Sequence, residues 1–222
     1  MARVVAAVLV VAAGMVSGCG PRGMGPAAPP PVWQEQFNRV SGWSVLPAGA
    51  QVGSDGSGLI VRDWGQAQRI VLEKPLPFPL PPGQTFSLAA RLVTDDDPAG
   101  RAGGVAVALL DEQDRVIGQI TWHDDQPGAG YGSADIVAED NWPIYRTDPS
   151  GLGREFNTFN GNFVLSRRGN QWQALAEGKA LGKPLELEPT LWPAKIRITA
   201  TRLPGVPARA WRIEQIRLYV PR

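Results

Sequence analysis

The sequence contains one cysteine, Cys19, and one histidine, His123, among its 222 residues. A single cysteine excludes a disulfide within the chain, so stability must come from a packed hydrophobic core. A single histidine excludes a metal site built from several histidines of one chain. Having only one cysteine and one histidine therefore limits the cross-links and the metal sites that the chain can form.

The chain also lacks an excess of charge of either sign, with 22 basic and 21 acidic residues. Proteins that bind nucleic acids usually carry a basic excess or a basic patch, and neither is visible in the sequence. We therefore predict that the protein has no nucleic-acid partner.

Long apolar runs are missing except at the N-terminus, where Val4–Val16 carries no charge and follows Arg3. As a helix, about 13 residues at ~1.5 Å each reach only about 20 Å, short of the ~30 Å hydrocarbon core of a bilayer. A charged residue, a short apolar region and then small residues are typical of an export signal.

The run Val16-Ser17-Gly18-Cys19 follows this apolar region and precedes a proline-rich segment. It resembles the lipobox of bacterial lipoprotein precursors, with Val16 in the place of the more usual leucine. The resemblance implies that residues 1–18 are removed and that acyl chains on Cys19 anchor the protein to a lipid bilayer. Gly20, in place of the aspartate typical of inner-membrane lipoproteins, favours the outer membrane in an organism that has one. The alternative is an ordinary signal peptide with a chance cysteine.

The composition divides the rest of the chain into a linker, residues 19–31, and one domain, residues 32–222. The linker is rich in glycine and proline, which favours an extended and partly flexible spacer. The domain, of about 190 residues, is long enough to bury a core of its own.

Short alternating segments separated by turn residues predict an all-β fold, either a sandwich or a barrel. Gly169-Asn170 between two such segments predicts a two-residue hairpin of type II′, and a change of phase at Glu214-Gln215 predicts a β-bulge. Alternation places Phe86, Leu88, Ala90 and Leu92 on one face, Val116, Gly118, Ile120 and Trp122 on another, and Ile196, Ile198 and Ala200 on a third. The predicted strands are Gly58–Arg62, Gln68–Glu73, Thr85–Val93, Gly104–Leu110, Arg115–His123, Asn162–Arg168, Gln171–Ala176, Lys195–Thr201 and Ala210–Val220.

The order of these features resembles the concanavalin A-like jelly rolls, which include laminin-G-like, lectin and glucanase domains. The features are Gln36-Phe37, Gly42-Trp43, Gly58-Leu59-Ile60-Val61, the long strand from Phe86 and the closing strand Trp211–Val220. The resemblance implies two antiparallel sheets with a groove that often holds sugar. The glucanases of this family carry Glu-x-Asp-x-x-Glu on one strand, and this motif is missing here, which argues against hydrolysis of that type.

The segment 121–149 combines aromatic and polar residues, and we expect it to be a long connection that carries a ligand site. Aromatic rings stack on the apolar faces of sugars while neighbouring polar groups bind the hydroxyls. The predicted ligand-binding residues are Trp122, His123, Tyr131, Trp142, Tyr145 and Arg146. The alternative is that Trp122 belongs to the core and that the polar groups of the segment are merely solvated.

Other candidate sites have equally simple structural explanations. His123 beside Asp124 or Asp125 would be an acid–base pair, but neighbours on a strand point to opposite faces and no nucleophile motif accompanies them. Asp95-Asp96-Asp97 offers oxygen ligands for calcium and is explained as well by a polar turn, so no cofactor is predicted. The prolines of residues 74–82 are explained by a stiff loop rather than by a polyproline-binding partner.

Three functions are compatible with these observations. The first is a lipid-anchored protein of the cell envelope whose β-sandwich binds a ligand, most simply a glycan, without catalysis. The second is a structural or assembly lipoprotein that contacts another envelope protein. The third is a divergent glycoside hydrolase.

Overall fold

The computed structural model describes residues 30–78, 80, 84–94, 103–124, 133–146, 160–202 and 211–220. In these residues the chain forms strands and turns without a helix, as predicted. The predicted export signal, Cys19 and the linker up to residue 29 lie outside the described residues. Within the described part of the chain, no helix has the length and apolar character needed to span a membrane.

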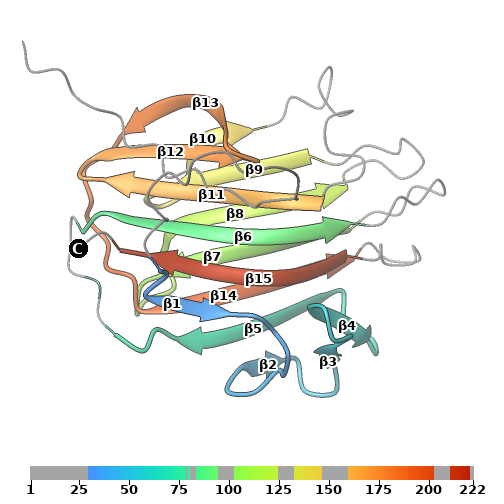
Figure 1. Ribbon diagram of the computed structural model, residues 1–222. Helices are drawn as coiled ribbons and strands as arrows, with labels where there is room; N and C mark the ends of the chain where they lie inside the picture. Colours follow the sequence, from blue (N-terminus) through green and yellow to red (C-terminus); the bar gives the residue numbers. More distant parts are fainter. Residues whose placement is uncertain are drawn as a thin grey trace, which may run out of the picture.

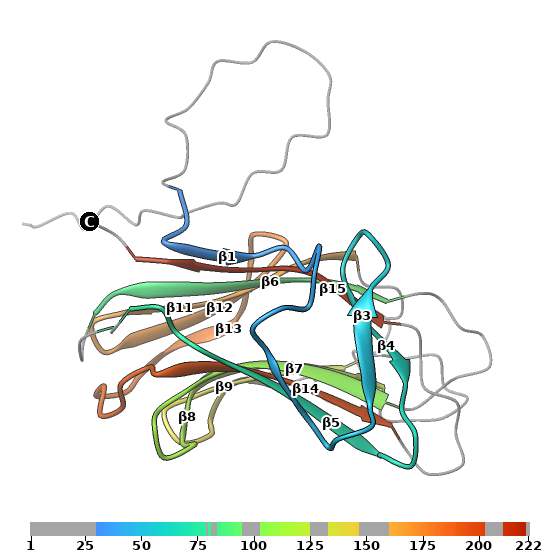
Figure 2. The same ribbon diagram turned by 90° about the horizontal axis from the view of Figure 1, so that it is seen from below.

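Two antiparallel sheets pack face to face (Figures 1 and 2), which confirms the predicted β-sandwich. In the eight-stranded sheet the order is β13 (Lys179–Glu186), β12 (Gln171–Ala176), β11 (Asn160–Arg168), β6 (Phe86–Thr94), β15 (Trp211–Tyr219), β4 (Leu59–Asp63) and β3 (Gln51–Ser54), with β1 (Trp33–Glu35) also paired to β15. In the seven-stranded sheet the order is β10 (Trp142–Arg146), β9 (Ser133–Ala138), β8 (Val116–Asp124), β7 (Gly103–Leu110), β14 (Lys195–Arg202), β5 (Arg69–Pro75) and β2 (Ser44–Leu46).

The hydrophobic core lies between the sheets and is filled by the residues that alternation selected. This layer contains Phe86, Leu88, Ala90 and Leu92 of β6 and Ile196, Ile198 and Ala200 of β14, and all of them are buried. One face of each of these strands is therefore apolar and packs in the core, while the other face points away from the core.

Two local predictions about the backbone are confirmed. Gly169 has φ +59° and joins β11 to β12, with Arg168 paired to Gln171 as a two-residue hairpin requires. The pairing of β15 with β6 shifts between Ile213 and Gln215, which is the predicted bulge.

One predicted face was wrong at a single position. Val116 was expected to share a face with Gly118, Ile120 and Trp122, but Val116 is only half-buried while Ile117 is fully buried. The cause is a second bulge, because Leu109 pairs with Gly118 and Leu110 pairs with Val116, leaving Ile117 between them.

The sequence pattern missed six strands. The segment 121–149, expected to be a connection, contains the end of β8 followed by β9 and β10. Of the others, β1, β2 and β3 have only three or four residues, too few for alternation to be recognised, and β13 is an edge strand without a fully buried residue.

Candidate functional site

The six predicted ligand-binding residues do not form one surface. Trp122 lies on the inner face of β8 with 0% of its surface exposed and belongs to the core between the sheets. Its ring has no face on which a ligand could stack, so the core interpretation of Trp122 is correct.

Three of the six residues lie partly or wholly outside the described residues. His123 pairs with Gly104 on one side and Ser133 on the other, and Arg146 pairs with Asp135. Their backbone positions are therefore fixed in the seven-stranded sheet, while their side chains, and all of Tyr131, fall outside the description.

Tyr145 and Trp142 lie on β10, the edge strand of the seven-stranded sheet. A bulge in β10 places Trp142 opposite Ala138 and Tyr145 opposite Ile136, so both side chains project from the same face of the strand. Tyr145 is half-buried against the core, beside Gly182 of β13. Trp142, by contrast, is 59% exposed and presents its ring to solvent.

A pocket of about 610 Å³ opens at the end of the seven-stranded sheet where β5 stops and β14 begins. Three segments form its walls: the residues after β5, the turn between β7 and β8, and the connection that leads from β13 into β14. The lining residues are Leu76, Pro77, Phe78, Leu80, Asp111, Glu112, Gln113, Arg115, Thr190, Trp192, Pro193 and Ala194. The wall after β5 is apolar, the wall formed by the β7–β8 turn is polar, and the segment before β14 contributes both kinds of side chain.

None of the six predicted ligand-binding residues is among the described residues that line this pocket, and its exposed tryptophan, Trp192, was not among the candidates. It is 60% exposed, although a tryptophan in a folded domain is usually largely buried. Its neighbours Leu191 and Pro193 are buried and hold the segment in place. The signal in the sequence was a tryptophan outside every alternating segment and directly before a proline.

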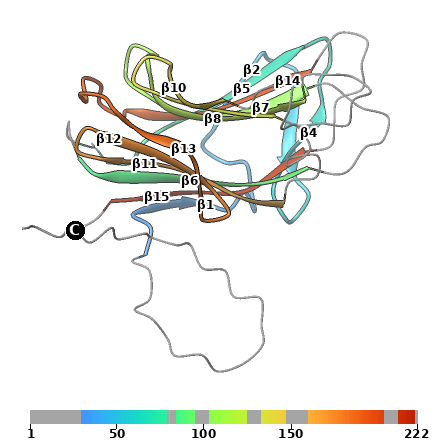
Figure 3. The same cartoon turned by 90° about the horizontal axis from the view of Figure 1, so that it is seen from above.

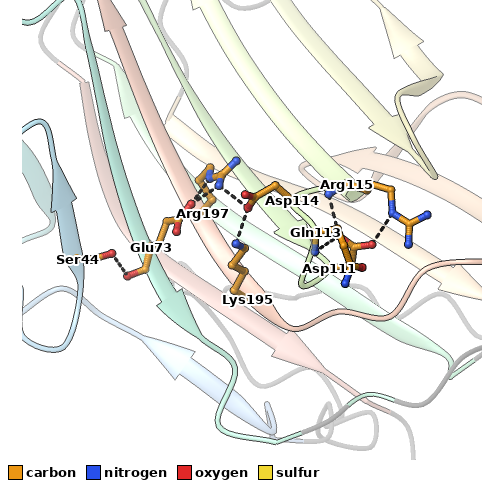
Figure 4. A network of polar contacts seen from close by, with 8 residues as sticks. All are labelled: Ser44, Glu73, Asp111, Gln113, Asp114, Arg115, Lys195 and Arg197. Atoms are coloured by element: carbon orange, nitrogen blue, oxygen red, sulfur yellow. Dashed lines mark hydrogen bonds and ion pairs between the residues drawn. The ribbon is translucent and has the colours of Figure 1, made fainter.

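The carboxylate of Asp111 shapes the polar wall (Figure 4). Its Oδ1 accepts hydrogen bonds from the backbone N–H groups of Gln113 and Arg115 at 2.9 and 2.8 Å, and its Oδ2 accepts one from Arg115 Nε at 2.7 Å. These bonds close the β7–β8 turn and fix the Arg115 side chain at the mouth of the pocket.

Next to the turn, charged groups are paired on the outer face of the sheet (Figure 4). Asp114 contacts both Lys195 and Arg197, and Arg197 also contacts Glu73. The hydrogen bond from Lys195 and the positive charge of Arg197 together lower the pKa of Asp114 below its ordinary value. These charges therefore neutralise one another, and their contacts hold the β7–β8 turn to β14 and β14 to β5.

A buried ion pair supports the segment before β14, which forms one wall of the pocket. Arg167 is completely buried, its Nη1 lies 3.2 Å from Glu139 Oε1, and its guanidinium contacts the rings of Phe86 and Trp172. The second oxygen of Glu139 accepts hydrogen bonds from the backbone N–H and the hydroxyl of Thr190 at 3.3 and 3.2 Å. Burial lowers the pKa of Arg167, and the charge of Glu139 opposes that shift. Glu139 thus connects the β9–β10 turn to the segment that carries Trp192.

The described residues contain no cluster of three or more histidine, cysteine, aspartate or glutamate side chains able to hold a metal ion. The calcium candidate, Asp95-Asp96-Asp97, lies outside the described residues, so that prediction remains open.

Comparison with known proteins shows the fold. No family model matches the sequence, and no curated protein matches it. Among solved structures, the chain is similar to the CBM2 module of the evolved Dit protein of Lactobacillus casei BL23 phage J-1, with a TM-score of 0.62 and 12% identity over 85% of this chain and 94% of that one.

Two further structures share the fold. The legume lectin-like domain from Entamoeba histolytica has a TM-score of 0.53 and 11% identity over 85% of this chain and 94% of that one. The GlcNAcα1-4Gal-releasing endo-β-galactosidase from Clostridium perfringens has a TM-score of 0.52 and 11% identity over 84% of this chain and 61% of that one. The domain is therefore a concanavalin A-like jelly roll, and identities this low establish the fold alone.

Proposed function

We propose that this protein is an exported lipoprotein of the cell envelope whose β-sandwich binds glycan without cleaving it. Acylated Cys19 anchors it to a lipid bilayer, the outer membrane in an organism that has one. The linker of residues 19–31 then carries the domain away from the lipid surface. The ligand-binding part of this proposal rests on the pocket at Trp192.

The observation that carries the proposal is an exposed tryptophan beside a pocket with a polar wall. Sugars have apolar faces of C–H groups and a rim of hydroxyls, so they bind where an aromatic ring lies next to hydrogen-bonding side chains. Trp192 offers the ring, and Gln113, Glu112 and Arg115 offer donors and acceptors. Carbohydrate-binding and lectin-like domains among the structural neighbours support the same ligand class.

The acidic residues near the pocket favour binding over hydrolysis. Both oxygens of Asp111 are occupied by hydrogen bonds within the turn, and Asp114 is paired with two cations. A glycosidase needs one carboxyl group as a proton donor and a second as nucleophile or base, both directed at the substrate. Neither Asp111 nor Asp114 is arranged for such a role. Among the described residues that line the pocket, Glu112 then remains as a single carboxylate, where the reaction needs two.

Binding of the full-length protein to an array of bacterial and other glycans tests the proposal. We expect Trp192→Ala to weaken binding at least about tenfold, which corresponds to ~1.4 kcal/mol of lost ring contact. Leu46→Ala is the matched control, because Leu46 is similarly exposed at 58% but lies on β2, away from the pocket lining.

Two results would overturn the proposal. If the wild-type protein binds no glycan, a partner protein of the envelope becomes the better explanation. If new reducing ends accumulate when the protein is incubated with a bound glycan, the domain is a hydrolase.

A further inference from the structure

Two tryptophans are unusually exposed, and both lie at the same end of the sandwich. Among the described residues, the exposed large hydrophobic side chains are Val32, Leu46, Trp142 and Trp192, of which only the tryptophans are aromatic. Trp192 lies on the connection that leads into β14, and Trp142 is the first residue of β10. A solitary exposed tryptophan needs no explanation, but a pair on one rim points to a shared ligand.

The two positions are joined by the hydrogen bonds of Glu139. Trp192 follows Thr190, which donates its N–H and its hydroxyl to Glu139 Oε2. Trp142 follows Glu139 through a turn in which Glu139, Asp140 and Asn141 have φ values of +33°, +59° and +74°. The hydrogen bonds between Glu139 and Thr190 therefore join the turn before Trp142 to the segment that carries Trp192.

The strand order of the sheet gives the spacing of the backbone between the pocket wall and Trp142. The pocket reaches Arg115, directly before β8, while Trp142 begins β10, two strands further along the same sheet end. Two strand spacings amount to about 10 Å. Trp142 is not among the residues that line the pocket, so a ligand that contacts both Trp142 and the pocket must extend beyond the pocket.

We infer that the site binds a linear glycan chain, with one sugar unit in the pocket against Trp192 and a later unit on Trp142. This inference rests on the proposed glycan binding and adds the length and direction of the ligand. The exposed Asp140 and Asn141 lie in the turn next to Trp142, where they provide polar groups for the chain between the two rings.

A glycan array that carries mono-, di-, tetra- and hexasaccharides of each linear glycan tests the inference with the full-length protein. For a recognised glycan, we expect the hexasaccharide to bind at least about tenfold more tightly than the disaccharide. Trp142→Ala and Trp142→Gln should remove that gain while leaving the disaccharide affinity unchanged. Trp192→Ala should weaken every length, and thermal melting should show that each variant is folded.

The outcomes separate this inference from the proposed function. Binding that does not strengthen with length, or Trp142 variants that retain the gain or weaken all lengths equally, would overturn the chain-binding site and leave glycan binding intact. An absence of binding to every glycan on the array would overturn both.

Discussion

The pair of Arg167 and Glu139 is the most deeply buried ion pair among the described residues. The guanidinium of Arg167 lies 4.9 and 5.4 Å from the ring centroids of Phe86 and Trp172, and its side chain is completely buried. Removing a guanidinium from water costs several kcal/mol unless an anion and hydrogen bonds compensate it. Glu139 supplies the anion, and it also binds Thr190 beside the pocket, so one carboxylate serves both the core and the site.

We expect Glu139→Gln to destabilise the protein by about 3 kcal/mol, because a buried Arg167 would lose its counter-charge. Urea unfolding at neutral pH measures this change. Glu214→Gln is the matched control, since Glu214 pairs with Arg91 at 2.6 Å on the partly exposed face of the sheet and its loss should cost less than about 1 kcal/mol. Equal effects of the two substitutions would contradict the assigned role of Glu139.

The contacts of Asp114 should make part of the unfolding free energy depend on pH in the acid range. Its pKa is lowered in the folded protein, first by the hydrogen bond from Lys195, so the unfolded chain binds a proton more readily. The stability that this group contributes is present above its unfolded pKa of about 3.9 and is lost as the pH falls through the folded value. Asp114→Asn and Lys195→Met should therefore both flatten the fall in unfolding free energy below about pH 4. Unchanged slopes in both variants would show that this carboxylate does not contribute.

At the scale of elements, the hairpin of β3 and β4 depends on a close approach to the bulge of β15 (Figure 2). Asp55 Oδ1 accepts hydrogen bonds from the N–H groups of Ser57 and Gly58 and so closes the turn. A Cβ atom at Gly58 would lie 2.5 Å from the carbonyl oxygen of Ile213 and 3.0 Å from the Cα of Glu214. Only glycine allows the two backbones to approach this closely.

We therefore expect Gly58→Ala to push β4 away from β15 and to destabilise the fold by about 1–3 kcal/mol. Chemical denaturation gives the overall change, and hydrogen exchange should show the loss of protection concentrated in β3 and β4. A variant as stable as the wild type would mean that the bulge moves easily to make room.

The elements also show where periodicity is informative. The phase change at Glu214-Gln215 was visible because apolar residues lie on both sides of it. The bulge at Ile117 was not visible, since Val116 and Ile117 are both apolar and either fits an inward position. Strand pairing, rather than residue type, decided which of the two enters the core.

At the scale of the whole molecule, the chain enters the domain beside its own last strand (Figures 1 and 3). Val32 N donates a hydrogen bond to Leu218 O at 2.9 Å, and β1 pairs with β15 from Trp33↔Leu218 onward. Leu218 pairs in turn with Leu88 near the start of β6, so this is the end of the sandwich that also carries the pocket. The proposed anchor thus joins the domain at the end where the ligand would bind.

We expect Cys19→Ser to release the protein from the membrane fraction of its native host, because the serine cannot accept a thioether-linked lipid. Fractionation followed by mass spectrometry measures this, and the wild-type protein should begin at an acylated Cys19. A wild-type protein with a bare thiol, or one that keeps its first methionine, would overturn the lipoprotein proposal.

The sequence by itself determined the all-β class, most of the central strands, the Gly169-Asn170 hairpin and the bulge at Glu214-Gln215. These follow from local alternation and turn chemistry, which neighbouring residues express without help from the rest of the chain. Only the tertiary structure decided that Trp122 is core, that Trp142 is exposed, and that Trp192 lies beside a pocket. The exposure of an aromatic ring depends on which distant segments cover it, and Glu139, Thr190 and the β7–β8 turn come together only when both sheets have formed.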